Sequence, residues 1–217
     1  MNASSSPDAP GRDCPLCARL AAFRVAQRAA QPTWYNAPVP SFGELDARLL
    51  IVGLAPGLRG ANCTGRPFTG DYAGVLLYGT LTKFGLAYGD YAERADDGLT
   101  LVDCRITNAV RCVPPANKPE TDEIRNCGRF LAAEIAAMPR LVAILALGQV
   151  AHRAVLAAHN HKRARYPFGH GAVHELPGGL TLADSYHCSR YNTNTGQLTQ
   201  PMFEAVFAEL KRRLALP

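Results

Sequence analysis

Short apolar runs that alternate with helical patterns constrain the fold of this chain most. Three of these runs, each bounded by turn residues, are predicted to be buried strands: 48–53, 101–109 and 141–147. Because helical patterns separate them, we expect a mostly parallel sheet with helices on both faces, an α/β fold. Two further short strands, 173–176 and 180–183, are predicted on either side of the turn Pro177-Gly178-Gly179.

Several helix starts can be predicted from capping residues. Asp71 is a good N-cap for a helix that reaches about residue 84, because its carboxylate can accept a first-turn N–H. Asn117 precedes Pro119 and stands three residues before Glu120, which resembles a capping box at the start of another helix. Other helices are expected over 14–30, over 149–158 and from about 201 onward.

The chain is expected to form one large domain over residues 13–217, preceded by a disordered lead-in over residues 1–12. Its 217 residues are 47% apolar, which is enough for a sizeable core. Residues 1–12 lack the pattern of a signal peptide, and we find no apolar stretch of membrane-spanning length. We therefore expect a cytoplasmic protein that needs no membrane. The formal net charge of +5 is compatible with a polyanionic partner but does not identify one.

Seven cysteines of irregular spacing argue against a secreted disulfide framework and favour metal binding or catalysis. Cys14 and Cys17 form a C-x2-C pair, and Cys112 and Cys127 complete a candidate set of four. Four thiolates suit a structural zinc or a [4Fe–4S] cluster. The wide separation of Cys112 from Cys127 slightly favours iron–sulfur over zinc. The simpler interpretation is that these two cysteines are buried small residues.

Three loops should lie together at the carboxyl edge of the sheet, where ligands bind in such folds. They follow Gly53, Asn108 and Asp184. The first is rich in glycine and proline and contains Phe68, which is either a stacking surface for a planar base or a plug of the core. Asp71 ends that loop, as a helix cap, as a catalytic carboxylate, or as both.

The other two loops carry one polar candidate each. The amide of Asn108 can match the O4 and N3–H edge of uracil, although an asparagine at a strand end is usually a turn residue. The imidazole of His187 can support negative charge on a leaving base. The polar segment after His187 either contacts a nucleic-acid backbone or forms a solvated loop.

Four motifs in this order resemble the uracil-DNA glycosylase superfamily, specifically its iron–sulfur-containing family 5. They are GLAPG (53–57), TGRPFTGD (64–71), TNAVRCVPPANKP (107–119) and HCSRYNTNTG (187–196). The resemblance runs from about Cys14 to Leu214. It implies a three-layer αβα sandwich around a four-stranded, mostly parallel sheet, with the cysteine-bearing amino-terminal helix at a structural [4Fe–4S] cluster.

The resemblance also implies a role for individual residues. The catalytic residues would be Asp71, His187 and Asn108. The flipped base would be bound by Gly53, Ala55, Phe68, Asn108 and His187. DNA would be bound by Arg59, Arg66, Ser189, Arg190, Asn192 and Asn194, and the cluster by Cys14, Cys17, Cys112 and Cys127. Since Leu54 and Ala55 leave the first motif without a water-positioning side chain, that duty falls to Asp71.

The expected activity is hydrolysis of the glycosidic bond of uracil, and of other deaminated bases, flipped out of double-stranded or single-stranded DNA. We identify no lysine in the pocket loops for a Schiff base, so we expect a monofunctional enzyme, acting as a monomer. One alternative is a protein that binds or covalently traps a damaged base without releasing it. The other is a zinc-stabilised nucleotide-binding protein.

Overall fold

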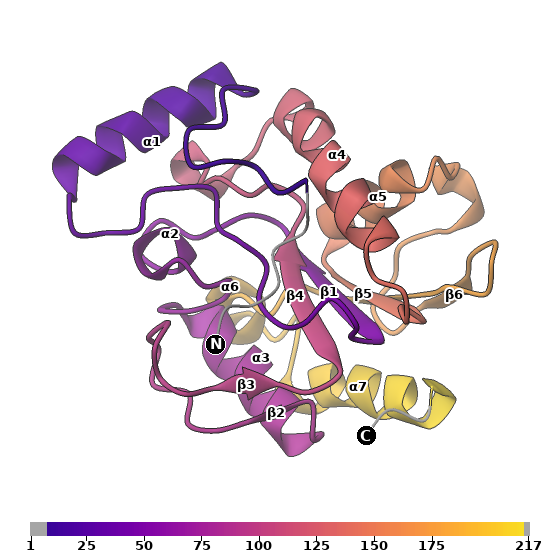
Figure 1. The fold of residues 1–217 in the computed structure, drawn as a ribbon. Helices are drawn as coiled ribbons and strands as arrows, with labels where there is room; N and C mark the ends of the chain where they lie inside the picture. Colours follow the sequence, from indigo (N-terminus) through magenta and orange to yellow (C-terminus); the bar gives the residue numbers. More distant parts are fainter. Residues whose placement is uncertain (1–7, 215–217) are drawn as a thin grey trace.

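A five-stranded sheet forms the middle layer of the protein, and helices cover both of its faces (Figure 1). This computed structural model describes residues 8–214, so the predicted disordered segment 1–12 lies in large part outside the described residues. The strand order is β4-β1-β5-β7-β6. The strands are β1 (Leu49–Gly53), β4 (Cys104–Asn108), β5 (Ala143–Leu147), β6 (Val173–Glu175) and β7 (Thr181–Ser185).

The sheet has five strands, where four were expected. Strands β4, β1, β5 and β7 are parallel, and β6 adds an antiparallel edge in which Val173 pairs with Ala183. The turn between β6 and β7 is too short for a crossover, so the two strands can only form a hairpin. The strand predicted over 101–109 is interrupted at Asp103, whose φ is 51°. Its first part forms β3 (Thr100–Leu101), which pairs with β2 (Ala87–Tyr88) in a separate small sheet.

Two helices pack on each face of the main sheet (Figure 1). They are α3 (Tyr72–Lys83) and α7 (Gln200–Leu214) on one face and α4 (Thr121–Ala136) and α5 (Gln149–Ala158) on the other. Leu49 and Ile51 belong to the first core, whereas Leu50 and Val52 belong to the second. Both faces of β1 are therefore buried, which explains why its sequence is a continuous apolar run.

The remaining helices lie in the connections. Helix α1 (Ala18–Ala30) lies beside α4, and the ion pair between Arg19 and Glu123 joins the two. The short elements are α2 (Ala61–Thr64), α6 (Arg190–Asn194) and the 3-10 turns η1 (Pro115–Asn117) and η2 (Arg163–Arg165).

One predicted helix cap is confirmed and one is wrong. The Asp71 carboxylate accepts the Gly74 N–H at 3.3 Å and caps α3. Helix α4 is capped by Glu120 rather than by Asn117, because the Glu123 carboxylate accepts the Glu120 N–H at 2.7 Å in a capping box. Asn117 instead ends the η1 turn with a φ of 56°.

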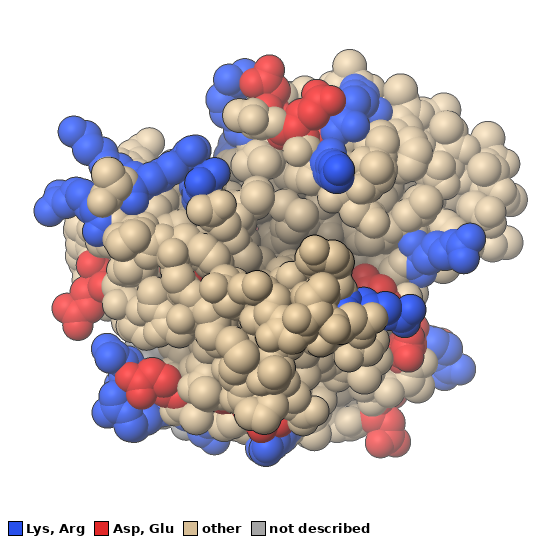
Figure 2. Space-filling view, turned by 180° about the vertical axis from the view of Figure 1, so that it is seen from behind, with Lys and Arg blue, Asp and Glu red and all other residues tan. Residues whose placement is uncertain are grey.

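Charged groups do not form a broad field of one sign on the face shown in Figure 2. Blue and red side chains lie mainly toward its edges, often near one another, and uncharged side chains occupy most of its centre. A ligand on this face would therefore be bound by local contacts rather than by a large basic surface. Within residues 8–214, no helix has the length and apolar character needed to cross a membrane.

Candidate active site

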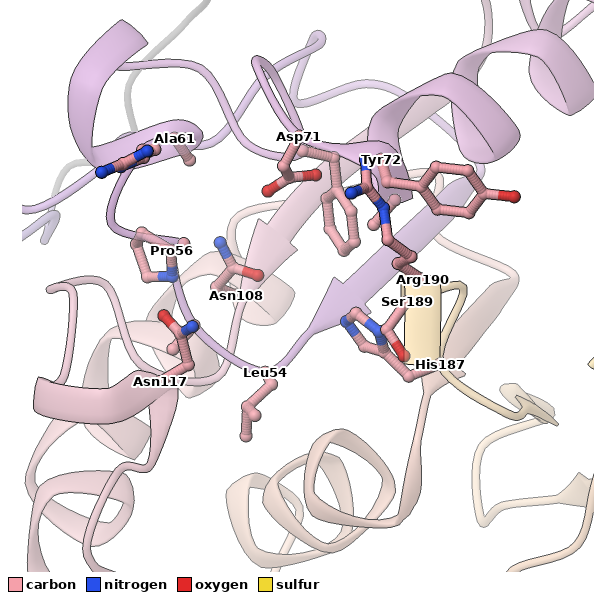
Figure 3. A pocket seen from close by; sticks show the side chains of 15 residues that line it. Leu54, Pro56, Ala61, Asp71, Tyr72, Asn108, Asn117, His187, Ser189 and Arg190 are labelled. Carbon is pink, nitrogen blue, oxygen red and sulfur yellow. The ribbon is translucent and has the colours of Figure 1, made fainter. Parts of the chain in front are cut away.

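A cavity of about 660 Å³ opens where the loops after β1, β4 and β7 meet (Figure 3). This is the carboxyl edge of the parallel strands, the position predicted from the order of the elements. Its wall includes Leu54, Ala55, Pro56, Gly57, Arg59, Ala61, Phe68, Asp71, Tyr72, Ala73, Asn108, Asn117, His187, Ser189 and Arg190. The site therefore brings together the three predicted catalytic residues from three separate segments of the chain.

Gly53 allows two of the cavity side chains to approach each other. It is the last residue of β1 and pairs with Asn108 at the end of β4. A Cβ atom on Gly53 would lie 2.4 Å from the Asn108 Oδ1 and 2.5 Å from the Phe68 ring, closer than packed atoms permit. Gly53 thus contributes to the predicted site because it has no side chain, which leaves room for Asn108 and Phe68.

Phe68 lies in the core and also lines the cavity. Its side chain belongs to the core under α3, and the ring also lines the cavity, with its centre 5.9 Å from that of the His187 ring. The φ of Phe68 is 52°, which is strained for a residue with a side chain. The Tyr91 hydroxyl holds this backbone by donating to the Phe68 carbonyl at 3.1 Å. The ring is therefore fixed before any ligand binds.

Asp71 is a helix cap whose carboxylate also faces the cavity (Figure 3). Burial raises its pKa above the ordinary value of 3.8, although backbone N–H groups of Gly74 and Ala73 oppose the rise. The first loop packs tightly against it, since a Cβ atom on Gly60 would lie 2.5 Å from the Asp71 Oδ2. A partly desolvated carboxylate held in this way can stabilise a nearby positive charge strongly.

His187 faces the cavity from the loop after β7 (Figure 3). Burial lowers the pKa of His187 to about 4, so the imidazole is neutral near pH 7 and can donate one ring N–H. Asn192 donates its amide to the His187 carbonyl at 2.8 Å, and Ser189 caps α6 through the Asn192 N–H. Asn192 and Ser189, which were predicted to bind DNA, thus hold the loop that carries His187 in shape.

The predicted DNA-binding residues divide by exposure. Arg59 and Arg190 are exposed at the cavity, and the Arg190 guanidinium lies 5.3 Å from the centre of the Tyr72 ring. Asn194 is exposed in α6 but does not line the cavity. Arg66 contradicts its prediction: its side chain is buried and makes a 2.7 Å ion pair with Asp97. An arginine held inside the fold cannot contact DNA.

Two cavity residues with polar side chains, Asn117 and Tyr72, were missed by the sequence reasoning. Asn117, interpreted as a helix cap, places its amide at the cavity wall opposite His187, and Tyr72 follows Asp71 at the rim (Figure 3). Asn117 could have been predicted as a cavity residue, because it lies in the Pro-rich loop that leaves the second predicted strand. Loops at the carboxyl edge of a sheet commonly supply binding residues.

Three cysteines of the predicted metal set pack together beside this cavity, and the Arg24 side chain links the backbone of the fourth, Cys14, to the Cys112 sulfur. Cys17 precedes α1, Cys112 follows β4, and Cys127 lies in α4. Cys112 and Cys127 form a small buried cluster against which Cys17 and Ala55 pack. Since Ala55 also lines the cavity, the cysteine cluster supports the first loop from behind.

The donor groups around the sulfurs fit a thiolate-bound centre. The Cys127 sulfur accepts the Arg111 N–H at 3.3 Å, and the Cys17 sulfur accepts the Asn126 amide at 3.8 Å. The Arg24 guanidinium also donates to the Cys112 sulfur at 3.3 Å. Cysteine sulfurs surrounded by N–H donors suit either a structural zinc ion or an iron–sulfur cluster.

Comparison with known proteins agrees with this geometry. Residues 40–211 match the model of the uracil DNA glycosylase superfamily. The chain is 46% identical to a type-5 uracil-DNA glycosylase of Thermus thermophilus over 94% of both chains. It is 40% identical to one of Pyrobaculum aerophilum, over 94% of this chain and 88% of the relative. A type-4 enzyme of the same organism is 36% identical over only 54% of this chain. The chain therefore belongs to the uracil DNA glycosylase superfamily, and its near full-length relatives are type-5 enzymes.

Proposed function

We propose that this protein is a monofunctional DNA glycosylase that removes uracil from DNA by hydrolysis. The observation that carries the proposal is that Asp71, Asn108 and His187 line the same cavity, beside the fixed ring of Phe68. A base inside a duplex cannot reach such a cavity, so the nucleotide must be flipped out. The relatives described above bear the name of this activity.

Four cavity residues have assigned tasks in the proposed reaction. Asn108 bonds the Watson–Crick edge of uracil, and Phe68 stacks on its face. As the glycosidic bond breaks, the neutral His187 donates a hydrogen bond to the uracil O2, where negative charge develops. Asp71 stabilises the cationic sugar and orients the attacking water. No lysine lines the cavity within the described chain, so no Schiff-base lyase step is expected.

A duplex that carries one labelled uracil tests the proposal. Incubation with excess protein should leave an abasic site, seen as a nicked strand only after treatment with hot alkali. Nicking without alkali would contradict the monofunctional assignment. A retained or crosslinked strand with no free uracil would show that the protein binds or traps the base. The same assay with hypoxanthine and xanthine tests our further expectation that deaminated purines are substrates.

Replacing His187 by alanine should reduce the single-turnover rate by about 10-fold to 100-fold, because one donor to the leaving base is lost. We expect a smaller loss than at a localised oxyanion, since uracil spreads its negative charge over the ring. Thermal melting should change little, because His187 lies at the cavity wall. A wild-type rate in the variant would remove His187 from the mechanism. The partly buried His161, which lies outside the cavity wall, provides the matched alanine control.

The plot of reaction rate against pH should have an acidic limb that comes from Asp71. Because burial raises the pKa of Asp71 above 3.8, the carboxylate is protonated, and the rate falls, at a higher pH than for an ordinary aspartate. His187 has a pKa of about 4 and gains its proton only in acid, so the Asp71→Asn variant is needed to separate the two groups. Single-turnover rates across the acid range should fall with decreasing pH in the wild type, and this limb should be absent from Asp71→Asn. An unchanged limb in that variant would assign it to another group.

We further propose that the DNA partner is a duplex with a mispaired uracil, with single strands also accepted. Arg59 and Arg190 at the cavity supply positive charge for the phosphates. The protein is proposed to act as a monomer. It is also proposed to act in a reducing cytoplasm, which fits its seven free cysteines. Competition with undamaged DNA of each form would rank the substrates, and sedimentation would give the assembly state.

We propose that Cys14, Cys17, Cys112 and Cys127 hold a structural [4Fe–4S] cluster. The cluster would tie the segment before α1 to the loop after β4 and to α4, behind the Ala55 segment of the cavity. Support comes from the N–H groups of Arg24, Arg111 and Asn126, which donate to three of the four sulfurs. Anaerobically purified protein should be brown and contain iron and sulfide. A colourless sample with stoichiometric zinc would contradict this assignment.

A further inference from the structure

Arg24 is a buried cation that makes no hydrogen bond or ion pair with a carboxylate in the described part of the chain. Its side chain is only 3% exposed, although it lies on α1 near the surface of the molecule. One terminal nitrogen donates to the Cys112 sulfur at 3.3 Å, and the other donates to the Cys14 carbonyl at 3.0 Å. The buried Nε has no hydrogen-bond partner in the described structure.

Other buried arginines of the protein are neutralised. Arg105 and Arg111 share the carboxylate of Glu134, and Arg66 pairs with Asp97. Within residues 8–214, no hydrogen bond or ion pair joins Arg24 to an acidic side chain. The acidic group closest along the chain, Asp13, is exposed and bonded to Arg28.

A guanidinium stays protonated inside a protein, so its burial is costly unless a negative charge lies close by. The groups that accept hydrogen bonds from Arg24 belong to two of the four cysteines: the sulfur of Cys112 and the backbone carbonyl of Cys14. As neutral thiols they supply no charge. Four thiolates around a metal centre carry net negative charge, which would balance the arginine.

We propose that Arg24 is the counter-charge of the four-cysteine centre: it donates to the Cys112 sulfur, retains the centre and raises its reduction potential. The inference rests on the proposed cofactor. Positive charge and N–H donors near the sulfurs stabilise the reduced form, which is the more negative one. Arg24 is thus a positioning residue that acts through Cys112 rather than on DNA.

The test compares Arg24→Gln, Arg24→Lys and Arg19→Gln with the wild type. Arg19 is the matched control, because it lies on the same helix and docks α1 onto α4 through Glu123, with an Nε to Oε1 distance of 2.8 Å. It touches no sulfur. Iron per chain, the visible spectrum, the rate of bleaching by a chelator and the midpoint potential are measured on anaerobic full-length protein.

Arg24→Gln should lose more than half of its iron, which is about the effect expected when a metal ligand loses a hydrogen-bond partner. If the variant keeps its iron, its midpoint potential should be lower than that of the wild type and its bleaching faster. Arg24→Lys should keep the iron and a potential closer to wild type, and Arg19→Gln should match wild type. Wild-type iron and potential in Arg24→Gln would overturn the inference. So would equal losses in Arg24→Gln and Arg19→Gln, which would indicate helix docking alone. A wild-type sample without iron would instead contradict the cofactor proposal itself, and zinc retention would then be compared in the same variants.

Discussion

Replacing Asp71 by asparagine is expected to lower the single-turnover rate of uracil release by at least about 100-fold. The substitution keeps the size of the side chain and removes the negative charge that faces the sugar. Because the site is partly desolvated, that charge is worth more there than in water. Rates with excess protein and a labelled uracil duplex measure the chemical step directly.

The same variant should fold at least as well as the wild type. Asparagine caps helices as well as aspartate, so α3 keeps its first-turn hydrogen bond. A raised carboxyl pKa means that the folded state favours the protonated form, so the ionised Asp71 costs stability as pH rises through that pKa. Asparagine removes this cost at neutral pH. An equal or higher melting temperature with a much lower rate is therefore the expected pair of results.

The exposed Asp90 provides the control, since it lies on a loop outside the cavity. Asp90→Asn should retain the wild-type rate. If Asp71→Asn also kept that rate, the carboxylate would have no part in catalysis. If Asp71→Asn lost activity together with its fold, the capping role would outweigh the chemical one.

The layers of the fold could be predicted because their causes are local. A strand buried on both faces must be apolar throughout, as β1 is, and an aspartate before an apolar helix caps it, as Asp71 does. The position of the site followed from the order of strands and helices. The sequence pattern did not reveal that the hairpin strand β6 joins the main sheet, because pairing between strands is not encoded within either one.

The site residues that were misplaced depend on distant partners. Arg66 was expected at DNA, but Asp97, which lies 31 residues away, holds it inside the fold. Glu134 lies on a helix whose polar residues look solvated in sequence, yet it is completely buried. Charged residues that pair across elements have no local signature, so their burial cannot be recognised from spacing.

Glu134 should therefore be among the most sensitive positions for stability. Its carboxylate bonds Arg105 at 2.7 Å, Thr107 at 3.0 Å and Arg111 in a short contact. Glu134→Ala would remove the acid shared by two buried guanidinium groups, and breaking a buried pair in this way costs about 3–5 kcal/mol. The free energy of unfolding from urea titration measures this loss. Glu209 of α7, whose side chain is 34% exposed and pairs with Arg212 and Arg213, provides the control, and its alanine variant should change stability little.

Glu134→Gln separates charge from packing, because glutamine keeps the volume and some hydrogen bonds. Burial opposes ionisation of Glu134, but the charges of Arg111 and Arg105 outweigh it and lower the pKa of this carboxyl. Its stabilisation is therefore present above the ordinary carboxyl pKa and is lost as pH falls through the lowered value. Glu134→Gln should be destabilised at neutral pH, and its difference from wild type should shrink in acid. A constant difference at every pH would mean that shape, rather than charge, holds the end of β4 and with it Asn108.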